Sequence, residues 1–234
     1  IKAGINEGDT IAVGMTGSMP GANIALLSAC KAMNIYPVII SSMGASMWGA
    51  TEPEFTWIDM EHILYEQELF DKISIAYSLG GRGDCLRNSK DEIGRDLFDQ
   101  KMQKYNVEKI NYSLSMNNLY QSINQRIALF ENNIKSIDNY VAYVNIGGGA
   151  ASIGVGGKDR LNTPGYLSPK KVLSQKPNES VARYFAENDI PLIHILHIPQ
   201  LVRGILPFGS EELSVGDSKI YKQEKYNLVI NIVA

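Results

Sequence analysis

Short apolar segments rich in β-branched residues recur along this chain, each followed by small or polar residues and then by a longer amphipathic stretch. The clearest of these segments are Thr10–Gly14, Pro37–Ser42, Ile73–Ser78, Tyr140–Ile146 and Leu192–Leu196. Repeated strand–loop–helix units are typical of an α/β fold. Because the segments are almost continuously apolar rather than alternating, they predict parallel strands covered by helices on both faces. We therefore expect a doubly wound, mostly parallel sheet in a Rossmann-like, three-layer arrangement.

The stretches between these segments have the length and composition of helices. They cover Asn23–Met33, Trp57–Phe70, Lys90–Tyr105, Leu119–Lys135 and Ser180–Asn188. Two weaker strand segments are Val107–Tyr112 and Leu228–Val233. Right-handed crossovers would place the helices on the two faces of the sheet.

Residues 154–178 differ in composition from the rest of the chain. Glycines and prolines interrupt a polar stretch in which no helical or strand period is visible. Such punctuation is typical of a long loop or lid. The chain has 234 residues, of which 44% are hydrophobic, and this is enough for one core. We therefore expect a single α/β domain over residues 1–234, with a loop or lid excursion at residues 154–178.

Charge and cysteine content argue against several classes of protein. The 22 Lys and Arg residues and the 25 Asp and Glu residues leave a formal net charge of -3 and are spread along the chain. They indicate no nucleic-acid surface. The two cysteines, Cys30 and Cys85, are too few for a disulfide framework and are expected to be small buried hydrophobes, with their redox state left open. No run reaches the roughly 18 apolar residues of a membrane helix, so these residues are expected to form a soluble domain.

Four of the strand segments lead into loops of small or polar residues. These loops are Thr16-Gly17-Ser18, Gly44-Ala45-Ser46, Gly80-Gly81 and Gly147-Gly148-Gly149. In an open α/β sheet the loops at the carboxyl ends of the strands lie together and form the ligand crevice, although any single glycine could serve only its turn. The residues expected to bind a ligand there are Thr16, Gly17, Ser18, Gly21, Asn23, Ser46, Trp57, Gly80, Gly81, Asp84, Asn145, Gly147 and Gly148. Arg82 is expected to line the third loop beside Asp84.

The first loop joins a strand to a helix, where free backbone N–H groups favour an anion. It lacks the Lys-Ser/Thr ending of a P-loop, and its glycines do not match the dinucleotide-binding pattern. The loop therefore predicts a bound carboxylate or phosphate and indicates no cofactor. The alternative is that Thr16 or Ser18 only caps the helix.

Four residues are candidates for catalysis, namely Ser46, Asp59, Glu61 and His194. Ser46 follows a strand in a turn one residue longer than the nucleophile elbow of hydrolases, and ordinary hydrogen bonding is its alternative role. Asp59 and Glu61 could serve acid–base chemistry beside His62, but Asp59 also has the position of a helix-capping acid after Thr56.

Geometry limits what these candidates can do together. Two residues apart on a helix, Asp59 and Glu61 point about 160° apart, so we predict no shared metal site. His194 and His197 face opposite ways at the end of a strand and are not a ligand pair. His194 is expected to reach the crevice, and His197 to serve a turn.

Six segments, in this order, resemble the poly-γ-glutamate system protein family of bacterial polymer-synthesis clusters. They are Thr16–Ala25, Gly44–Ala50, Thr56–Glu61, Ser78–Gly81, Val144–Gly148 and Pro191–His194. Two departures stand out: the family carries a membrane-proximal segment before the first strand, and its loop after His197 is richer in Pro and Asp than Gln200–Gly209. From the first residue, Ile1, and the apolar run at residues 228–234 we expect a natural protein that extends beyond both ends.

The resemblance implies a part in making or exporting a γ-linked glutamate polymer together with other subunits of the synthesis machinery. It also implies membrane attachment through segments outside this chain, with this domain outside the cytoplasm. It supplies no catalytic residues. Three functions follow as alternatives: a domain that binds glutamate-like or phosphate anions, a hydrolase or amide-transferring enzyme acting on the polymer, and a scaffold that docks synthetase subunits.

Overall fold

The computed structural model describes residues 3–44, 52–86, 92–156 and 160–201. Its internal contacts divide the chain into one unit of residues 1–196 and another of residues 197–234. In the second unit the described part is His197 and the short helix α8 (Ile198–Leu201). A single domain spanning residues 1–234 stays a prediction.

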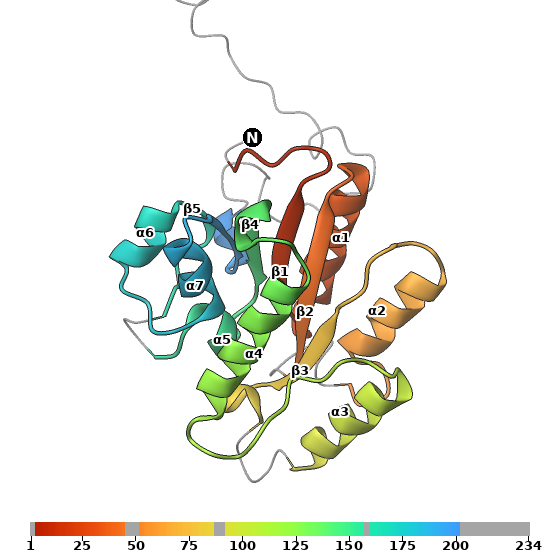
Figure 1. The fold of residues 1–234 in the computed structure, drawn as a ribbon. Helices are drawn as coiled ribbons and strands as arrows, with labels where there is room; N and C mark the ends of the chain where they lie inside the picture. The colour runs from red at the N-terminus through yellow and green to blue at the C-terminus, as the bar shows by residue number, and fades with distance from the viewer. Residues whose placement is uncertain (1–2, 45–51, 87–91, 157–159, 202–234) are drawn as a thin grey trace, which may run out of the picture. The chain divides into compact units, whose positions relative to one another are not determined.

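The first unit is built on a six-stranded sheet, shown in Figure 1. Its strands are β1 (Thr10–Thr16), β2 (Tyr36–Gly44), β3 (Ala76–Gly80), β4 (Tyr140–Ile146), β5 (Gly165–Leu167) and β6 (Leu192–Ile195). The spatial order is β3-β2-β1-β4-β6-β5, and every neighbouring pair is parallel except β5 with β6. The chain winds outward from β1 to β3 and then resumes on the other side at β4. This reversal makes a topological switch point between β1 and β4, where open α/β sheets bind ligands.

Helices cover both faces of this sheet. They are α1 (Pro20–Ala32), α2 (Trp57–Glu66), α3 (Glu92–Lys104), α4 (Asn118–Asn132), α5 (Ala150–Ile153), α6 (Pro169–Ser174) and α7 (Val181–Glu187), with 3₁₀ turns η2 (Arg82–Asp84) and η4 (Ile137–Asn139). On one face α1 and α2 pack against the sheet, and on the other α4, α5 and α7 do so. The predicted three-layer, mostly parallel α/β fold is confirmed.

The side chains of β1 show how the strand sequence fills both layers. Ile11, Val13 and Met15 join the cluster beneath α1 and α2, whereas Ala12 joins the cluster beneath α4 and α7. This alternation follows from the two-residue period of a strand. On the second face the ring of Phe185 stacks on Tyr143 with centroids 4.9 Å apart. Both faces are therefore apolar, which is why the strand segments read as continuously hydrophobic.

Residues 154–178 are not wholly a loop, and here the sequence expectation was wrong. They contain the edge strand β5 and the helix α6, which begins where the Ser168 side chain accepts a bond from the Lys171 backbone N–H. A three-residue strand is too short to show a period, so composition alone concealed it. β5 pairs antiparallel with β6 and forms that edge of the sheet.

The weaker strand expected at Val107–Tyr112 is also absent from the described secondary structure. Only a single bridge joins Lys109 to Tyr77, flanked by backbone bonds from Tyr77 to Glu108 (2.9 Å) and from Ile110 to Tyr77 (2.8 Å). The segment therefore touches the edge of β3 at one point without continuing along it. The other weak segment, Leu228–Val233, lies outside the described residues.

Cys30 and Cys85 are both free and buried, as expected of small hydrophobic side chains. Burial raises the pKa of the Cys30 thiol to about 11. Among the helices that the described ranges contain, none is long and apolar enough to cross a membrane.

Candidate functional site

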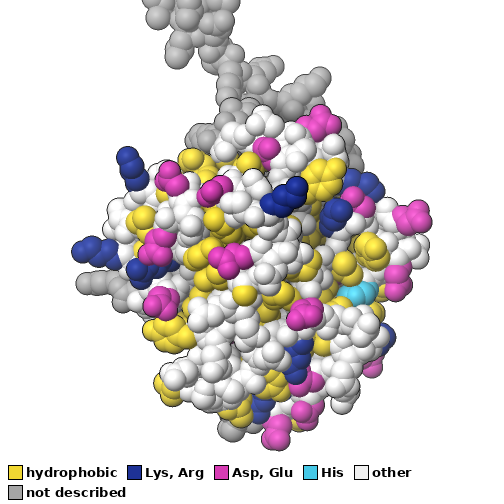
Figure 2. All heavy atoms as spheres, in the orientation of Figure 1, with side chains coloured by type: hydrophobic (Ala, Val, Ile, Leu, Met, Phe, Trp, Pro, Cys, Tyr) yellow, Lys and Arg dark blue, Asp and Glu magenta, His cyan; other side chains and the backbone are white. Residues whose placement is uncertain are grey.

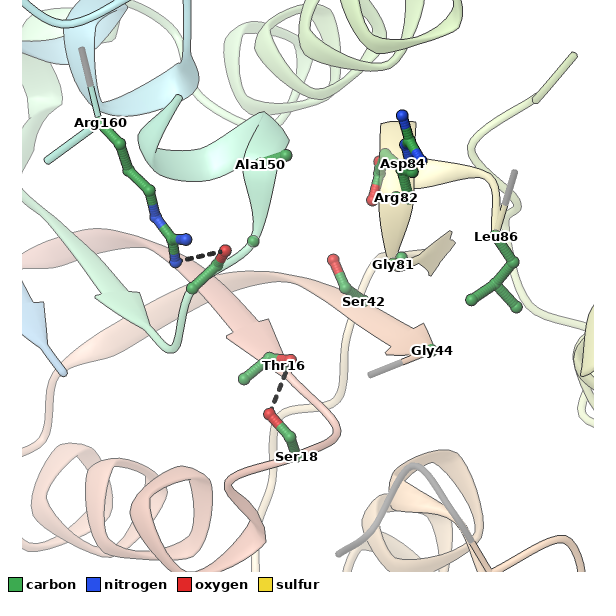
Figure 3. Close-up of a pocket in the computed structure, with 13 residues that line it drawn as sticks. Thr16, Ser18, Ser42, Gly44, Gly81, Arg82, Asp84, Leu86, Ala150 and Arg160 are labelled. Atoms are coloured by element: carbon green, nitrogen blue, oxygen red, sulfur yellow. Dashed lines mark hydrogen bonds between the residues drawn. The ribbon is translucent and has the colours of Figure 1, made fainter. Parts of the chain in front are cut away.

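A crevice of about 540 Å³ lies at the carboxyl ends of β1, β2, β3 and β4, at the switch point of the sheet (Figure 3). Its described lining is Thr16, Ser18, Ser42, Gly44, Gly80, Gly81, Arg82, Asp84, Leu86, Gly148, Gly149, Ala150 and Arg160. This volume falls within the range of about 300–1,000 Å³ that is usual for small-molecule sites. Of the described residues in the four predicted strand-end loops, those that line this crevice are Thr16, Ser18, Gly44, Gly80, Gly81, Gly148 and Gly149.

The loop after β1 presents two hydroxyl groups to this crevice. The Thr16 and Ser18 hydroxyls lie 3.3 Å apart, and the buried Asn23 side chain donates to the Thr16 carbonyl at 2.9 Å. The N-cap of α1 is Met19, and no side chain caps this helix. Thr16 and Ser18 therefore do not serve as helix caps, which leaves their hydroxyls available to a ligand.

The loop after β4 packs tightly against the first loop. Gly147 has φ +90°, and a Cβ atom there would lie 2.1 Å from Thr16 Cγ2, so only glycine fits. The Asn145 side chain donates to the Gly147 carbonyl at 2.7 Å and fixes the turn. Gly148 and Gly149 consequently reach the crevice, and Arg160 closes it by donating to the Gly148 carbonyl at 2.9 Å.

The turn after β3 brings a carboxylate to the same place. Asp84, at the end of η2, is 4% exposed and has φ +58°, a conformation that costs a non-glycine residue about 1–3 kcal/mol. Arg82, in the same turn, is exposed at the rim.

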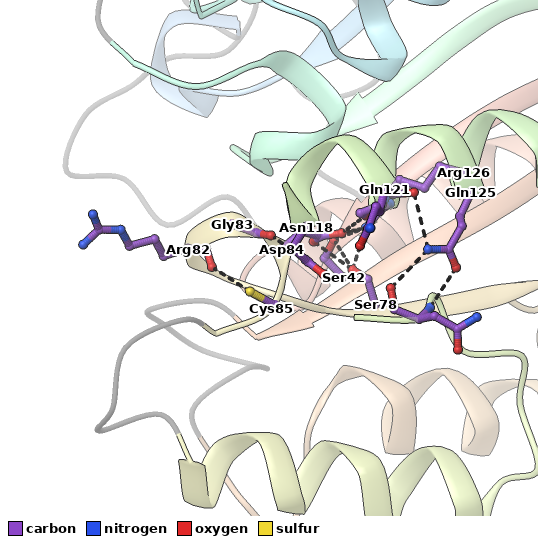
Figure 4. Close-up of polar contacts among 12 residues, drawn as sticks. Ser42, Ser78, Arg82, Gly83, Asp84, Cys85, Asn118, Gln121, Gln125 and Arg126 are labelled. Carbon is purple, nitrogen blue, oxygen red and sulfur yellow. Dashed lines mark hydrogen bonds and ion pairs between the residues drawn. The ribbon is translucent and has the colours of Figure 1, made fainter. Parts of the chain in front are cut away.

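A buried polar network anchors Asp84 from beneath the crevice (Figure 4). Arg126 of α4 is 2% exposed, and its Nη2 lies 3.0 Å from Asp84 Oδ2 and 3.0 Å from Ser42 Oγ. The Ser78 hydroxyl lies 2.9 Å from Asp84 Oδ1, and Ser122 donates to Oδ2 of the same carboxylate. Four elements therefore meet at one ion pair.

The charge balance of the crevice favours an anion. Arg82 and Arg160 are the cationic side chains of its described lining, and Asp84 is the carboxylate. Because Arg126 neutralises Asp84 from below, the two rim guanidinium groups are left to attract negative charge. On the face drawn in Figure 2, by contrast, acidic and basic side chains are interspersed and gather into no single-sign patch.

Several residues expected to bind a ligand support the crevice instead of lining it. Asn23 and Asn145 are buried braces for the loops, and Gly17 donates its N–H to the Ser42 carbonyl at 2.8 Å. Trp57 is fully buried with its Nε1 3.3 Å from Ser41 Oγ, and Gly21 is exposed on α1. Ser46 lies outside the described residues.

Asp59 proves to be a structural acid. It accepts from the Thr56 backbone N–H at 2.8 Å and from the Tyr105 hydroxyl at 2.9 Å, and it forms an ion pair with the buried Lys101. Burial opposes ionisation of Asp59, yet the bonds from Lys101 and Thr56 hold its pKa below the usual value. The capping alternative is confirmed.

Glu61 and His194 are buried away from the crevice lining. Glu61 accepts from the hydroxyls of Ser74 (2.9 Å) and Tyr77, and burial raises its pKa to about 7. His194 is fully buried, with its Nδ1 3.1 Å from Asn145 Nδ2. Asp59 and Glu61 thus belong to separate networks, and the described ranges contain no cluster of three or more His, Cys, Asp and Glu residues arranged for a metal.

Sequence reasoning missed the residues that come from outside the glycine loops. Ser42 ends the expected strand segment Pro37–Ser42 and was not among the residues expected to bind a ligand, and Arg160 lies within the expected lid. Arg126 lies in the middle of a helix, 84 residues from Ser42, and no local pattern marks it. A cationic residue on the apolar face of the 118–132 helix was the one signal that could have found it.

Comparison with protein-family models, with curated proteins and with solved structures finds no match to this chain.

Proposed function

We propose that this chain is an accessory component of poly-γ-glutamate synthesis or export that binds an anionic group, a glutamate-like carboxylate or a phosphate, in the strand-end crevice. The observation that carries the proposal is the charge arrangement of the crevice. Two arginines, Arg82 and Arg160, and three hydroxyl-bearing residues, Thr16, Ser18 and Ser42, belong to its described lining. Its one described carboxylate, Asp84, is neutralised by Arg126.

Arg160 is the strongest point of attachment for such an anion. Its Nη2 is held by the Gly148 carbonyl, while its Nε is buried and has no hydrogen-bond partner among the described residues. A buried donor without a partner costs about 1–3 kcal/mol, so a ligand oxygen that accepts from it would recover this loss. Guanidinium groups bind carboxylates and phosphates well because two of their N–H donors can bond to two oxygens of the same group at once.

The glutamate polymer as ligand rests on the resemblance of the six segments to the poly-γ-glutamate system family. Each residue of a γ-linked glutamate chain carries a free carboxylate, which is the group that the crevice favours. Membrane attachment, a position outside the cytoplasm and contact with other subunits of the machinery belong to the same proposal and rest on the same resemblance.

A titration of ¹⁵N-labelled protein with a γ-glutamate oligomer tests the proposal by NMR. We expect the amide signals of Gly80, Gly81 and Gly148 to shift with saturation. Arg160→Gln removes charge-assisted hydrogen bonds of about 1.5–3 kcal/mol and should weaken binding by roughly 10-fold or more.

The matched control is Arg183→Gln, because Arg183 lies on α7 in an exposed pair with Glu187. This variant should bind as the wild type does. Unmoved glycine signals at saturating oligomer, or equal affinity in Arg160→Gln, would rule the proposal out.

An enzyme that uses the catalytic residues suggested by the sequence receives less support from this geometry, and so does a scaffold. Of the catalytic candidates that are described, Asp59, Glu61 and His194 do not line the crevice. A scaffold would have no need of a buried ion pair and paired hydroxyls beneath an open crevice. Pull-down with the other subunits of the machinery separates a scaffold from a ligand-binding domain.

A further inference from the structure

We propose that Ser42 is a nucleophile for acyl transfer in this crevice, with Ser78 relaying its proton to Asp84. This is an activity beyond ligand binding, and it uses none of the catalytic candidates that the sequence suggested. Only the identity of its acyl substrate, a γ-linked amide, depends on the proposed function.

Ser42 has the position that a nucleophile needs. It lies near the carboxyl end of β2, and its hydroxyl points into the open space of the crevice, between the loop of Thr16 and the turn of Asp84 (Figure 3). Only 5% of the residue's surface is exposed, however, because hydrogen bonds hold the same hydroxyl from below. A ligand in the crevice would therefore meet an oxygen atom that is already fixed in place.

The hydrogen bonds beneath Ser42 define a path for its proton. The Ser78 hydroxyl lies 2.9 Å from Asp84 Oδ1 and 3.2 Å from Ser42 Oγ, and its single proton can serve only one of these contacts. The ionised carboxylate is the stronger acceptor, so Ser78 donates to Asp84. In the structure Ser78 is the donor of its contact with Ser42, so the relay requires the Ser78 proton to turn to Asp84. The Ser78 oxygen then keeps one lone pair for Arg126 and has the other for the Ser42 proton, and a chain of two hydroxyls leads from the crevice to a carboxylate.

Arg126 completes the arrangement by its charge. Its Nη2 lies 3.0 Å from Ser42 Oγ and also contacts Ser78 Oγ and Asp84 Oδ2. A cation at this distance favours the negative charge that develops on Ser42 as its proton leaves. It also holds Asp84 in one orientation, which fixes the far end of the relay.

The buried network costs free energy that apolar residues in the same place would not cost. An ion pair buried to this degree loses several kcal/mol of hydration for each ion, and apolar residues of similar size are often as stable. Asp84 in addition holds a positive φ. Strained residues of this kind concentrate at functional sites.

The reaction balances without any further reactant than water. Ser42 Oγ bonds to the carbonyl carbon of the amide, while the Ser42 proton moves to Ser78 and the Ser78 proton moves to Asp84. The proton then passes from Asp84 through Ser78 to the amide nitrogen as the C–N bond breaks, which leaves an ester on Ser42. Water adds to the ester carbon and gives a proton to Ser78, which passes its own to Asp84. As the C–O bond breaks, the proton returns through Ser78 to the Ser42 oxygen, and the free acid is released.

A fluorophosphonate probe tests the nucleophile without knowledge of the substrate. The probe loses fluoride when a serine oxygen bonds to its phosphorus. We expect intact mass measurement to show one phosphonyl group per chain and peptide mapping to place it on Ser42. Ser42→Ala should abolish the label, and Ser174→Ala, on the exposed helix α6, should label at the wild-type rate.

Two variants test the relay. Ser78→Ala keeps the Asp84–Arg126 pair and should slow labelling by about 100-fold or more, the usual contribution of general-base assistance. Asp84→Asn should slow it similarly, but it leaves Arg126 buried without an opposing charge and requires a thermal unfolding check. Ser78→Ala keeps the test decisive if Asp84→Asn does not fold.

Three results would overturn the proposal: folded wild-type protein that takes no label, a label that persists in Ser42→Ala, or Ser78→Ala labelled at the wild-type rate. None of these depends on polymer binding. If the labelling experiments fail but the oligomer still binds in the NMR titration, the proposed function stands and the nucleophile does not. If Ser42 is labelled as expected but the oligomer does not bind, the nucleophile stands and the proposed function does not.

Discussion

Glu61 shows how a single buried carboxyl group can set the pH response of the fold. Its described partners are the hydroxyls of Ser74 and Tyr77, and Ser74 in turn contacts Ser41 at 2.7 Å. Hydroxyl groups stabilise a carboxylate less than a cation does, so the loss of hydration prevails and the pKa rises from 4.5 to about 7. Below about pH 7 the native state therefore holds Glu61 mainly in its protonated form.

We predict that the free energy of unfolding falls as the pH rises from about 4.5 to about 7. Between these values the unfolded chain has released the Glu61 proton and the native state still holds it, so each pH unit favours unfolding by up to about 1.4 kcal/mol. Glu61→Gln should flatten this part of the profile. Urea unfolding at pH 5 and pH 8 measures it, with the exposed Glu179→Gln as control; equal slopes in wild type and Glu61→Gln would refute the assignment.

The residues of the site divide by how far apart they lie in the sequence. Thr16, Ser18, Gly81 and Gly148 were predicted because each follows a strand in a glycine-containing loop, and the carboxyl ends of parallel strands meet. Arg126 was not predicted, because its partner Ser42 is 84 residues away and a helix pattern does not reveal which buried position holds a cation. Glycine-containing loops thus predict residues at the rim of the crevice, whereas the buried residues beneath it are found only in the folded structure.

At the level of elements, buried ion pairs join helices that the sequence identifies only separately. Every predicted helix is present, with its ends shifted by a few residues, because each of these segments is long enough to show helical periodicity in its sequence. β5 and α6 were missed, since three and six residues carry too little of any period, although Ser168 before Pro169 is a helix-start signal. The tie between α2 and α3, made by Asp59 and Lys101, had no sequence signal.

We predict that Asp59→Asn destabilises the protein by about 3–5 kcal/mol, because it leaves the Lys101 ammonium, 7% exposed, without its opposing charge. Chemical denaturation with a fixed m-value measures the loss. Lys109→Met, which breaks the half-exposed pair with Asp99, is the matched control and should cost less than about 1 kcal/mol. A loss in Asp59→Asn no larger than that of the control would show that Asp59 has no structural role.

At the scale of the first unit, the crevice lies where the two halves of the sheet meet. From one side come Ser42 of β2, Thr16 of β1 and Gly81, which follows β3. From the other comes Gly148, in the loop after β4. Arg126 reaches the crevice floor from α4, the helix that precedes β4 in the chain. A ligand held there contacts both halves at once, so its binding free energy should add to the stability of the whole unit.

We therefore predict that a γ-glutamate oligomer at 100 times its Kd stabilises the protein by about 2.7 kcal/mol. For a chain of this length such a gain corresponds to a rise in Tm of roughly 5–10 °C. Differential scanning calorimetry at fixed ionic strength measures it, with a neutral γ-linked glutamine oligomer of equal length as the ligand control. In Arg160→Gln the same oligomer concentration should raise Tm far less from that variant's own ligand-free value. An equal rise with the neutral oligomer would mean that the crevice does not select for charge, and an undiminished rise in Arg160→Gln would place the anion elsewhere on the protein.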